Sequence, residues 1–459
     1  MNNTPIKKIN CFVGNWVAEI DWNKTLYFDL DKLFFDKPIT ADRNLLELSS
    51  GTNTLKPSNV YLDSLSEDAK NWRRFNYYTA PLGDQNVREA IRIFEDYVGG
   101  YIPNNFHIAV TNGAAEALRL SFNYLNKNGK KSTLILGPQY GIVYQIMNLA
   151  GFVFKEMIGD PENGFLPEPE NIERELEKNQ FDVIFMTQPN NPTGSLYNLE
   201  QFERIVSIAK KYSTSIVYEK IGSDIKYKSS VNVHSYGEIF KNLNYWDETI
   251  IIDSLSKRRA VSGLRVGYIL GSNLLMKYIV ETRFGDCPPL LSKDGIIKDF
   301  IYSSIIHLME KNKNYKESCN MVLRKANDTF KVKFENILNA DEIFEHKNNI
   351  LQMYDTVYEN KSYIEEKLKP WIDGYTILDS GTNYMLCLKV PFNNEETFAK
   401  DLFNKEVVTV YPFGCFIGDQ ELNKKIFIPQ HFWVRVSCAV EKLLFKETVD
   451  RIANYLGGV

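Results

Sequence analysis

Segments with a helical pattern of apolar residues alternate with short apolar runs of strand length between residues 87 and 252. Helices are expected at 87–97, 114–125, 140–150 and 199–211, and strands at 106–111, 132–136, 183–187, 215–217 and 250–252. This alternation predicts βαβ units and a mostly parallel sheet with helices on its faces. In such sheets ligands bind at the carboxyl ends of the strands, so functional residues are expected there.

The remainder of the chain predicts a second, smaller domain. After residue 257 the pattern is mainly helical to about residue 370, and the tail has strands at 384–390 and 433–437 before a helix at 441–455. We predict a large domain at 59–330 and a small α+β domain built from 1–58 together with 331–459. The 459 residues suffice for two such cores. No chemistry is assigned to residues 275–345.

Composition excludes several classes of protein. The net charge of −4 provides no basic surface for nucleic acid or for a membrane, and no apolar run approaches a membrane span. The N-terminus leads into no apolar signal core. The six cysteines and five histidines are dispersed, which predicts neither a metal site nor a disulfide framework. A reduced cytoplasm is therefore the expected compartment.

The most specific chemistry follows the predicted strand at 250–252. Lys257 stands in Ser254-Leu255-Ser256-Lys257, and six residues later the chain reads Gly263-Leu264-Arg265-Val266-Gly267-Tyr268. A lysine placed there can form a Schiff base when its ammonium is desolvated or lies beside another cation. The hydroxyls of Ser254 and Ser256 and the guanidinium of Arg265 would bind a phosphate dianion. A lysine beside a phosphate pocket is what pyridoxal phosphate requires.

A second motif upstream identifies a family. The segment Asn190-Asn191-Pro192-Thr193-Gly194 precedes the lysine block with compatible spacing. With both motifs in order, the chain resembles the class I and II aminotransferases from about Leu48 to Val436. This resemblance implies the α/β fold of the aspartate-aminotransferase-like, pyridoxal-phosphate-dependent transferases. It also implies a large domain with a mostly parallel central sheet and a smaller α+β domain.

The resemblance assigns roles around the cofactor. Lys257 would hold the cofactor as a Schiff base and later move the proton between the substrate Cα and the cofactor, which needs a lowered lysine pKa. Ser254 and Arg265 would bind the phosphate. A second phosphate-binding turn would be formed at a helix N-terminus by small residues, namely Gly113, Ala114 and Ala115.

Further residues follow from the same resemblance. Tyr140 falls where the family places a ring stacked on the pyridine, and Asn191 where an asparagine bonds the phenolic oxygen. Tyr78 resembles the tyrosine that reaches the phosphate of the neighbouring subunit, which implies a homodimer with shared active sites. Arg435 matches the arginine that binds the substrate's α-carboxylate, and Gly51 resembles a glycine lining the same position.

The chain departs from the family after the strand at 215–217. The usual Asp-Glu-x-Tyr is replaced by Glu219-Lys220-Ile221-Gly222, so Glu219 takes the place of the aspartate that pairs with the pyridine nitrogen. Gly222 takes that of the tyrosine near the phenolic oxygen. Asp224 is the alternative partner of the nitrogen, and Tyr218 is a weaker third. Glu219 is preferred because the strand ends just before it.

The expected activity is amino-group transfer from an α-amino acid to a 2-oxo acid. The altered segment at Glu219 and Gly222 keeps a second activity open, a cyclase or a β/γ-eliminating lyase of the same fold, because many such reactions share a Cα carbanion. A regulator that uses this fold as a sensor is disfavoured, since the first 45 residues are too few and too weakly basic for a DNA-binding module.

Overall fold

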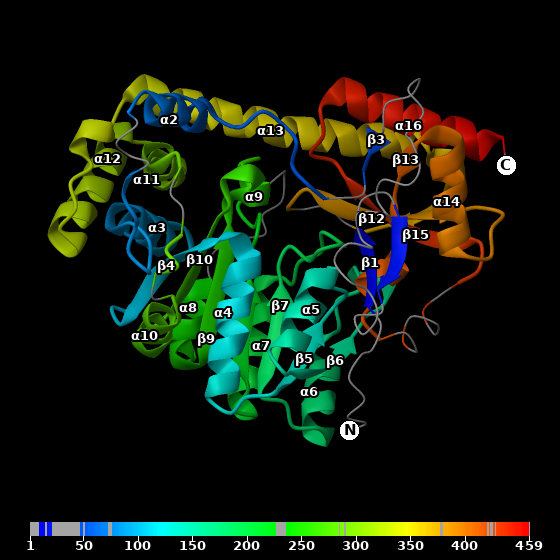
Figure 1. Ribbon diagram of the computed structural model, residues 1–459, viewed down its shortest axis with the longest axis horizontal. Helices are drawn as coiled ribbons and strands as arrows, with labels where there is room; N and C mark the ends of the chain where they lie inside the picture. The colour runs from blue at the N-terminus through cyan, green and yellow to red at the C-terminus, as the bar shows by residue number, and fades with distance from the viewer. Residues whose placement is uncertain are drawn as a thin grey trace.

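The protein is described from a computed structural model. The described residues are 9–13, 16–20, 46–48, 51–71, 76–225, 236–283, 285–288, 291–376, 380–419, 422, 426 and 428–458. They form an α/β molecule with one large and one smaller sheet (Figure 1).

The large sheet has seven strands in the order β4-β10-β9-β8-β7-β5-β6. Only β10 runs antiparallel to its neighbours, so the prediction of a mostly parallel sheet is confirmed. The strands are β4 (Phe106–Asn112), β5 (Ser132–Leu136), β6 (Val153–Met157), β7 (Val183–Thr187), β8 (Ser215–Glu219), β9 (Thr249–Ser254) and β10 (Val266–Ser272).

Helices cover both faces of this sheet. One face packs against α4 (Gly113–Lys127), α5 (Gly141–Leu149) and α10 (Asn273–Thr282). The other packs against α3 (Gln85–Val98), α6 (Pro169–Lys178), α7 (Leu199–Lys211), α8 (Tyr236–Asn242), α11 (Lys293–Asn312) and α12 (Tyr315–Arg324). Successive strand residues alternate between the two cores, as Ile250 and Ile251 do. Burial on both faces explains why these strands are continuously apolar.

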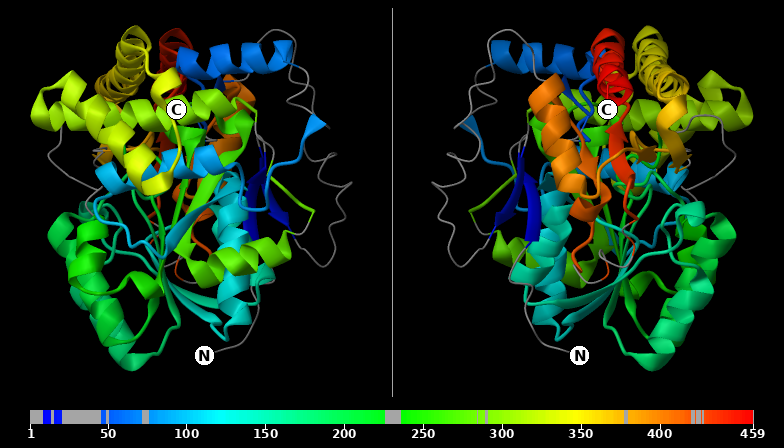
Figure 2. Two further views of the ribbon diagram at one scale, coloured as in Figure 1. Left: turned by 90° about the vertical axis from the view of Figure 1, so that its left-hand side faces the viewer. Right: turned by 90° about the vertical axis from the view of Figure 1, so that its right-hand side faces the viewer.

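The smaller sheet is antiparallel and has the order β11-β12-β15-β14. Its strands are β11 (Ile372–Tyr375), β12 (Asn383–Lys389), β15 (His431–Ser437) and β14 (Tyr411–Pro412). Its core includes side chains of α13 (Ala340–Lys367), α14 (Glu395–Glu406) and α16 (Lys442–Gly457). Helices α13 and α16 run side by side in Figure 2. A short parallel pair joins β3 (Leu46–Glu47) to β13 (Val408–Thr409).

Helix α13 connects the two parts of the molecule. It extends along one side of the molecule in Figure 1, above the short helix α2 (Asn59–Lys70) at one end and beside α16 at the other. Ile343 near its start belongs to the core of the large sheet, whereas Val357 belongs to the core of the small one. No helix among the described residues is long and apolar enough to cross a membrane.

Candidate active site

The carboxyl ends of β7, β8 and β9 open onto one cavity of about 600 Å³. Residues of the smaller sheet close its opposite side, among them Asn383 of β12 and Arg435 of β15. Most of the predicted site residues line it, namely Ala114, Ala115, Tyr140, Asn191, Glu219, Ser254, Lys257, Arg265 and Arg435. The structure therefore brings together side chains that are far apart in the sequence.

Lys257 lies in the short helix α9 (Leu255–Arg258) that follows β9. The helix is capped by Ser254, whose Oγ accepts a 3.1 Å hydrogen bond from the N–H of Ser256. Asn53 donates from Nδ2 to the carbonyl of Lys257 at 2.7 Å. The backbone carrying the lysine is thus held from both sides, and its side chain faces the cavity.

Arg265 lies beside the N-terminus of α4 where both line the cavity. Arg265 Nη2 donates to the carbonyl of Asn112 at 3.1 Å. Gly113 has φ +74°, and a Cβ there would lie 2.7 Å from Arg265 Nη2. A Cβ on Gly267 would lie 2.6 Å from the carbonyl carbon of Gly113. Both positions require glycine, and together they place a guanidinium beside a helix N-terminus, an arrangement suited to phosphate.

Substitution Gly113→Ala is expected to weaken cofactor binding about tenfold. The new Cβ must displace the Arg265 guanidinium, which loses part of a charge-assisted bond worth about 1.5 kcal/mol. Gly129→Ala is the matched control, because Gly129 has φ +84° but nothing lies within 4 Å of its Cβ position. Fluorescence titration with pyridoxal phosphate measures both variants. Equal affinities in the two variants would remove Gly113 from the anion site.

Glu219 is fully buried at the end of β8 and reaches the cavity. Its Oε1 accepts a 2.7 Å hydrogen bond from the Tyr140 hydroxyl and its Oε2 a 3.1 Å bond from the Thr187 hydroxyl. Burial raises the pKa of Glu219 to about 7, against the opposing effect of these two bonds. Thr187 is a contact that sequence reasoning did not identify, although its position at the end of β7 could have indicated it.

The two alternatives to Glu219 point elsewhere. Asp224 pairs with Arg258 at 3.3 Å and Arg259 at 2.9 Å and does not line the cavity. The side chain of Tyr218 is buried in the core on the other face of the sheet, as alternation along β8 requires. Of the three candidates for the partner of the ring nitrogen, Glu219, Asp224 and Tyr218, only Glu219 lines the cavity.

The buried carboxyl predicts a pH dependence of stability. Because the folded-state pKa of Glu219 is about 7 rather than 4.5, the folded protein binds its proton more tightly than the unfolded chain. Stability of the cofactor-free protein therefore falls as pH rises from about 4.5 to about 7, by about 3 kcal/mol from this group at ~1.4 kcal/mol per pKa unit.

Denaturant unfolding of wild type and Glu219→Gln at several pH values measures this contribution. Glu156 and Glu395 also have a pKa raised by burial to about 7, so the wild type retains a pH slope from them. The stability of the Gln variant relative to wild type should rise by about 3 kcal/mol between pH 4.5 and pH 7.5. A constant difference would mean that the carboxyl titrates normally.

Arg435 is 3% exposed and lines the cavity at the end opposite to Arg265. Its Nη1 donates to Asn191 Oδ1 at 2.9 Å, and its guanidinium lies 5.2 Å from the Tyr411 ring and 4.7 Å from the Phe416 ring. A Cβ on Gly51, where φ is +63°, would lie 3.2 Å from Arg435 Cζ. Sequence reasoning missed Tyr411 and Phe416, because only the fold brings that segment to the arginine.

Tyr78 lies apart from the cavity. Its side chain is 94% exposed, and it does not line the cavity of its own chain. The predicted contact of Tyr78 with a neighbouring subunit stays a prediction.

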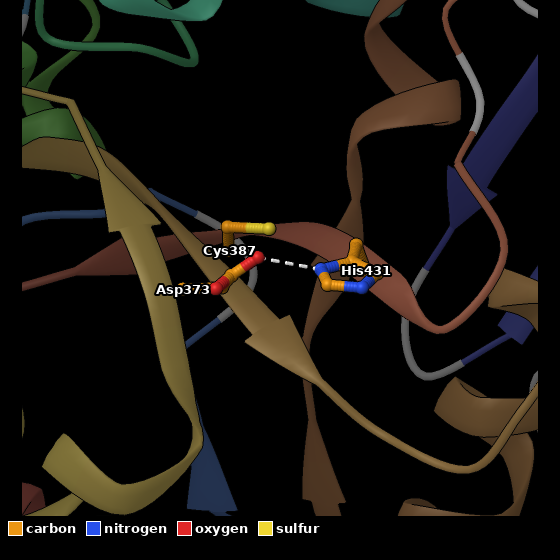
Figure 3. Close-up of side chains that lie close together, drawn as sticks. All are labelled: Asp373, Cys387 and His431. Carbon is orange, nitrogen blue, oxygen red and sulfur yellow. Dashed lines mark hydrogen bonds and ion pairs between the residues drawn. The ribbon is translucent and has the colours of Figure 1, made fainter.

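Three potential metal ligands also meet on the smaller sheet. Asp373, Cys387 and His431 have donor atoms within 4.8 Å of one another (Figure 3). His431 Nδ1 and Asp373 Oδ2 are 2.6 Å apart and form a hydrogen bond between β15 and β11, the two strands that flank β12. Burial raises the pKa of Cys387 to about 12, so its thiol stays protonated. The dispersed cysteine and histidine positions gave no signal of this cluster.

Both the sequence and the fold are similar to those of known proteins. The family model for aminotransferase class I and II matches residues 43–452. Kynurenine–oxoglutarate transaminase 3 of Homo sapiens is 27% identical over 251 residues, covering 52% of this chain and 54% of that protein. Aspartate aminotransferase of Thermotoga maritima is 31% identical over 197 residues, covering 42% and 50%. The chain thus spans about half the length of the curated relatives it matches.

Solved structures extend the likeness over most of the chain. Aspartate aminotransferase from Thermus thermophilus with maleate has a TM-score of 0.66 at 19% identity, covering 90% of this chain and 92% of that one. The aromatic aminotransferase from Pyrococcus horikoshii has a TM-score of 0.68 at 16% identity, covering 91% and 96%. At such low sequence identity the structural likeness establishes the fold alone. It confirms the predicted aspartate-aminotransferase-like fold.

Proposed function

Because this chain belongs to the class I and II aminotransferase family, we propose that it is a pyridoxal-phosphate-dependent aminotransferase. It would transfer the amino group of an α-amino acid to a 2-oxo acid. The observation that carries the proposal is the convergence of Lys257, Glu219 and Arg435 on one cavity. A nucleophilic amine, a buried acid and a carboxylate-binding guanidinium are the three groups that this chemistry requires.

The cavity suits pyridoxal phosphate at each end. Ser254, Arg265 and the N-terminus of α4 would bind the phosphate, and Glu219 would face the ring nitrogen. Tyr140, whose ring lines the cavity, would pack on the pyridine. When bound, the cofactor supplies an aldehyde that takes up the substrate amino group and a ring that withdraws electrons from Cα.

The chain's own residues would then orient the substrate and move its proton. Arg435 binds the α-carboxylate, and its position is fixed by the bond to Asn191 and by the ring faces of Tyr411 and Phe416. A substrate held in this way would present its Cα to the amine of Lys257, which lines the same cavity. The lysine amine would remove the proton from the substrate Cα and deliver it to the adjacent carbon of the cofactor. Ionised Glu219 would keep a proton on the ring nitrogen.

A cyclase or β/γ-eliminating lyase is the second candidate, and one observation favours it. Gly222 replaces the tyrosine expected near the phenolic oxygen, and the nearest atom to a Cβ there would be 3.6 Å away. A glycine there lacks the ring and the hydroxyl of that tyrosine, so the phenolic oxygen would have one hydrogen-bond donor fewer than in plain amino-group transfer by this family.

Half-reactions distinguish the two candidates. The protein loaded with pyridoxal phosphate is mixed with single L-amino acids of acidic, basic, aromatic and aliphatic type, and the cofactor absorbance is followed. An aminotransferase converts the aldehyde form to the amine form, and a 2-oxo acid restores the first spectrum. Turnover with release of product and no amine form of the cofactor would favour the lyase or cyclase instead.

Three finer statements belong to the same proposal. We propose a homodimer with shared active sites, supported by the exposure of Tyr78. We propose the domain boundaries 59–330 for the large domain and 1–58 with 331–459 for the small one, supported by two separate apolar cores, of which the larger also takes in the start of α13 at Ile343. The cytoplasm is the proposed compartment, supported by the dispersed cysteines.

A further inference from the structure

A network of buried charges lies in the large domain beneath the cavity. Its cations are Lys220, Arg258 and Arg259, and each is at most 2% exposed. Its carboxylates are Glu95, Asp224, Asp253 and Asp299. Buried charges are costly unless they are paired, so a cluster of this size needs an explanation beyond packing.

Asp253 is the centre of the network. Its Oδ2 lies 3.0 Å from Lys220 Nζ and 3.2 Å from Arg258 Nη1. The same oxygen accepts a 2.9 Å hydrogen bond from the Tyr268 hydroxyl. Its Oδ1 accepts a 2.7 Å bond from the backbone N–H of Ser254. One carboxylate thus joins two cations to the residue at the predicted phosphate site.

The network extends from Asp253 in two directions. Lys220 Nζ also lies 2.9 Å from Glu95 Oε1, and the Tyr236 hydroxyl donates to the Glu95 carboxylate. The Tyr268 hydroxyl lies between the Glu95 and Asp253 carboxylates, which share its single hydrogen. In the other direction Arg258 and Arg259 share Asp224, and Arg259 pairs with Asp299. His346 at the far end lies 2.9 Å from Asp299 and bonds Ser58.

Three members of the network are chain neighbours of three cavity residues. Lys220 follows Glu219, Asp253 precedes Ser254, and Arg258 follows Lys257. In strand β9 the successive side chains of Asp253 and Ser254 point to opposite sides, so one can face the network and the other the cavity. In helix α9, Lys257 lines the cavity while the next residue, Arg258, pairs with Asp253. The network therefore holds the backbone beside three of the cavity residues that would touch the cofactor, Glu219, Ser254 and Lys257.

We propose that Lys220, Asp253 and Glu95 are positioning residues, which hold Glu219, Ser254 and Lys257 in register and set the electrostatic potential at the lysine. The inference rests on the proposed function, since it concerns the cofactor bound at Lys257. With His346 neutral, three positive against four negative charges leave the network one unit negative. On the cavity side the charged groups near the lysine are Glu219, Arg265 and Arg435.

The electrostatic potential at Lys257 is tested by two variants that are expected to shift the pH midpoint of the cofactor absorbance in opposite directions. Glu95→Gln keeps the shape of the side chain and removes one negative charge, so the pH midpoint of the bound cofactor's absorbance should fall by about one unit. Lys220→Met removes one positive charge, so the midpoint should rise by a similar amount. The double variant should return close to the wild-type midpoint, because the two charge changes cancel.

The control is His346→Gln, at the far end of the network. This variant should change the thermal unfolding temperature but leave the pH midpoint of the cofactor absorbance unchanged. Unchanged midpoints in both single variants, with only lower unfolding temperatures, would mean that the network is structural and would overturn the inference. If the Lys220 variant does not fold, the fall in the isosteric Glu95→Gln variant decides alone. A wild type that binds no cofactor at Lys257 would refute the proposed function instead, so the two failures are distinguishable.

Discussion

Replacing Lys257 with Ala is expected to reduce amino-group transfer by about 10,000-fold or more, because both the nucleophile and the proton carrier are lost. The absorbance of the lysine-bound cofactor should disappear from the purified variant. Cofactor can still be held through Ser254 and Arg265, so dialysis should remove it more easily without abolishing binding. Absorbance spectra and turnover assays of the same preparation measure both effects.

Lys277→Ala is the matched control for this variant. Lys277 lies in α10 with a side chain that is 74% exposed and pairs only loosely with Glu281 at 3.9 Å. Its loss should leave spectrum and activity unchanged. A Lys257→Ala protein with the wild-type spectrum would show that another lysine holds the cofactor.

Replacing Arg435 with Lys is expected to raise the KM for the amino acid about 100-fold, equivalent to about 3 kcal/mol of lost charge-paired binding. Lysine keeps the positive charge but not the planar fork that binds a carboxylate through two parallel bonds. It also loses the 2.9 Å bond to Asn191 and the ring faces of Tyr411 and Phe416. Steady-state kinetics over a range of substrate concentrations measure the change.

Affinity for the cofactor should stay the same in this variant, since Arg435 lies at the end of the cavity opposite to Arg265. The control is Arg119→Lys in α4, where the arginine side chain is 53% exposed. Unaltered KM in the Arg435 variant would mean that another group binds the carboxylate.

Much of the large domain could be predicted because its strands are buried on both faces. Such strands are continuous apolar runs, and those at 132–136 and 183–187 coincide with β5 and β7. Strand β6 was missed because it forms the edge of the sheet and carries Lys155 and Glu156. Strand β10 was missed because Gly267 and Gly271 weaken the strand pattern.

The cavity residues at strand ends were predictable for a related reason, since the fold directs these ends to one place. The buried charges were not. In the sequence Lys220, Arg258 and Arg259 resemble ordinary surface charges, and only tertiary packing places them beside Glu95, Asp253 and Asp299. Residues 275–345, to which no chemistry was assigned, supply Asp299 from α11.

Reductive trapping of the cofactor tests the central claim most directly. Wild-type protein is loaded with pyridoxal phosphate, reduced with borohydride and digested with a protease. The masses of the resulting peptides are then measured by mass spectrometry. The added mass is expected on the peptide containing Lys257, and it should be absent when reduction follows incubation with an amino acid substrate. Label on a different lysine, or no label at all, would contradict the account.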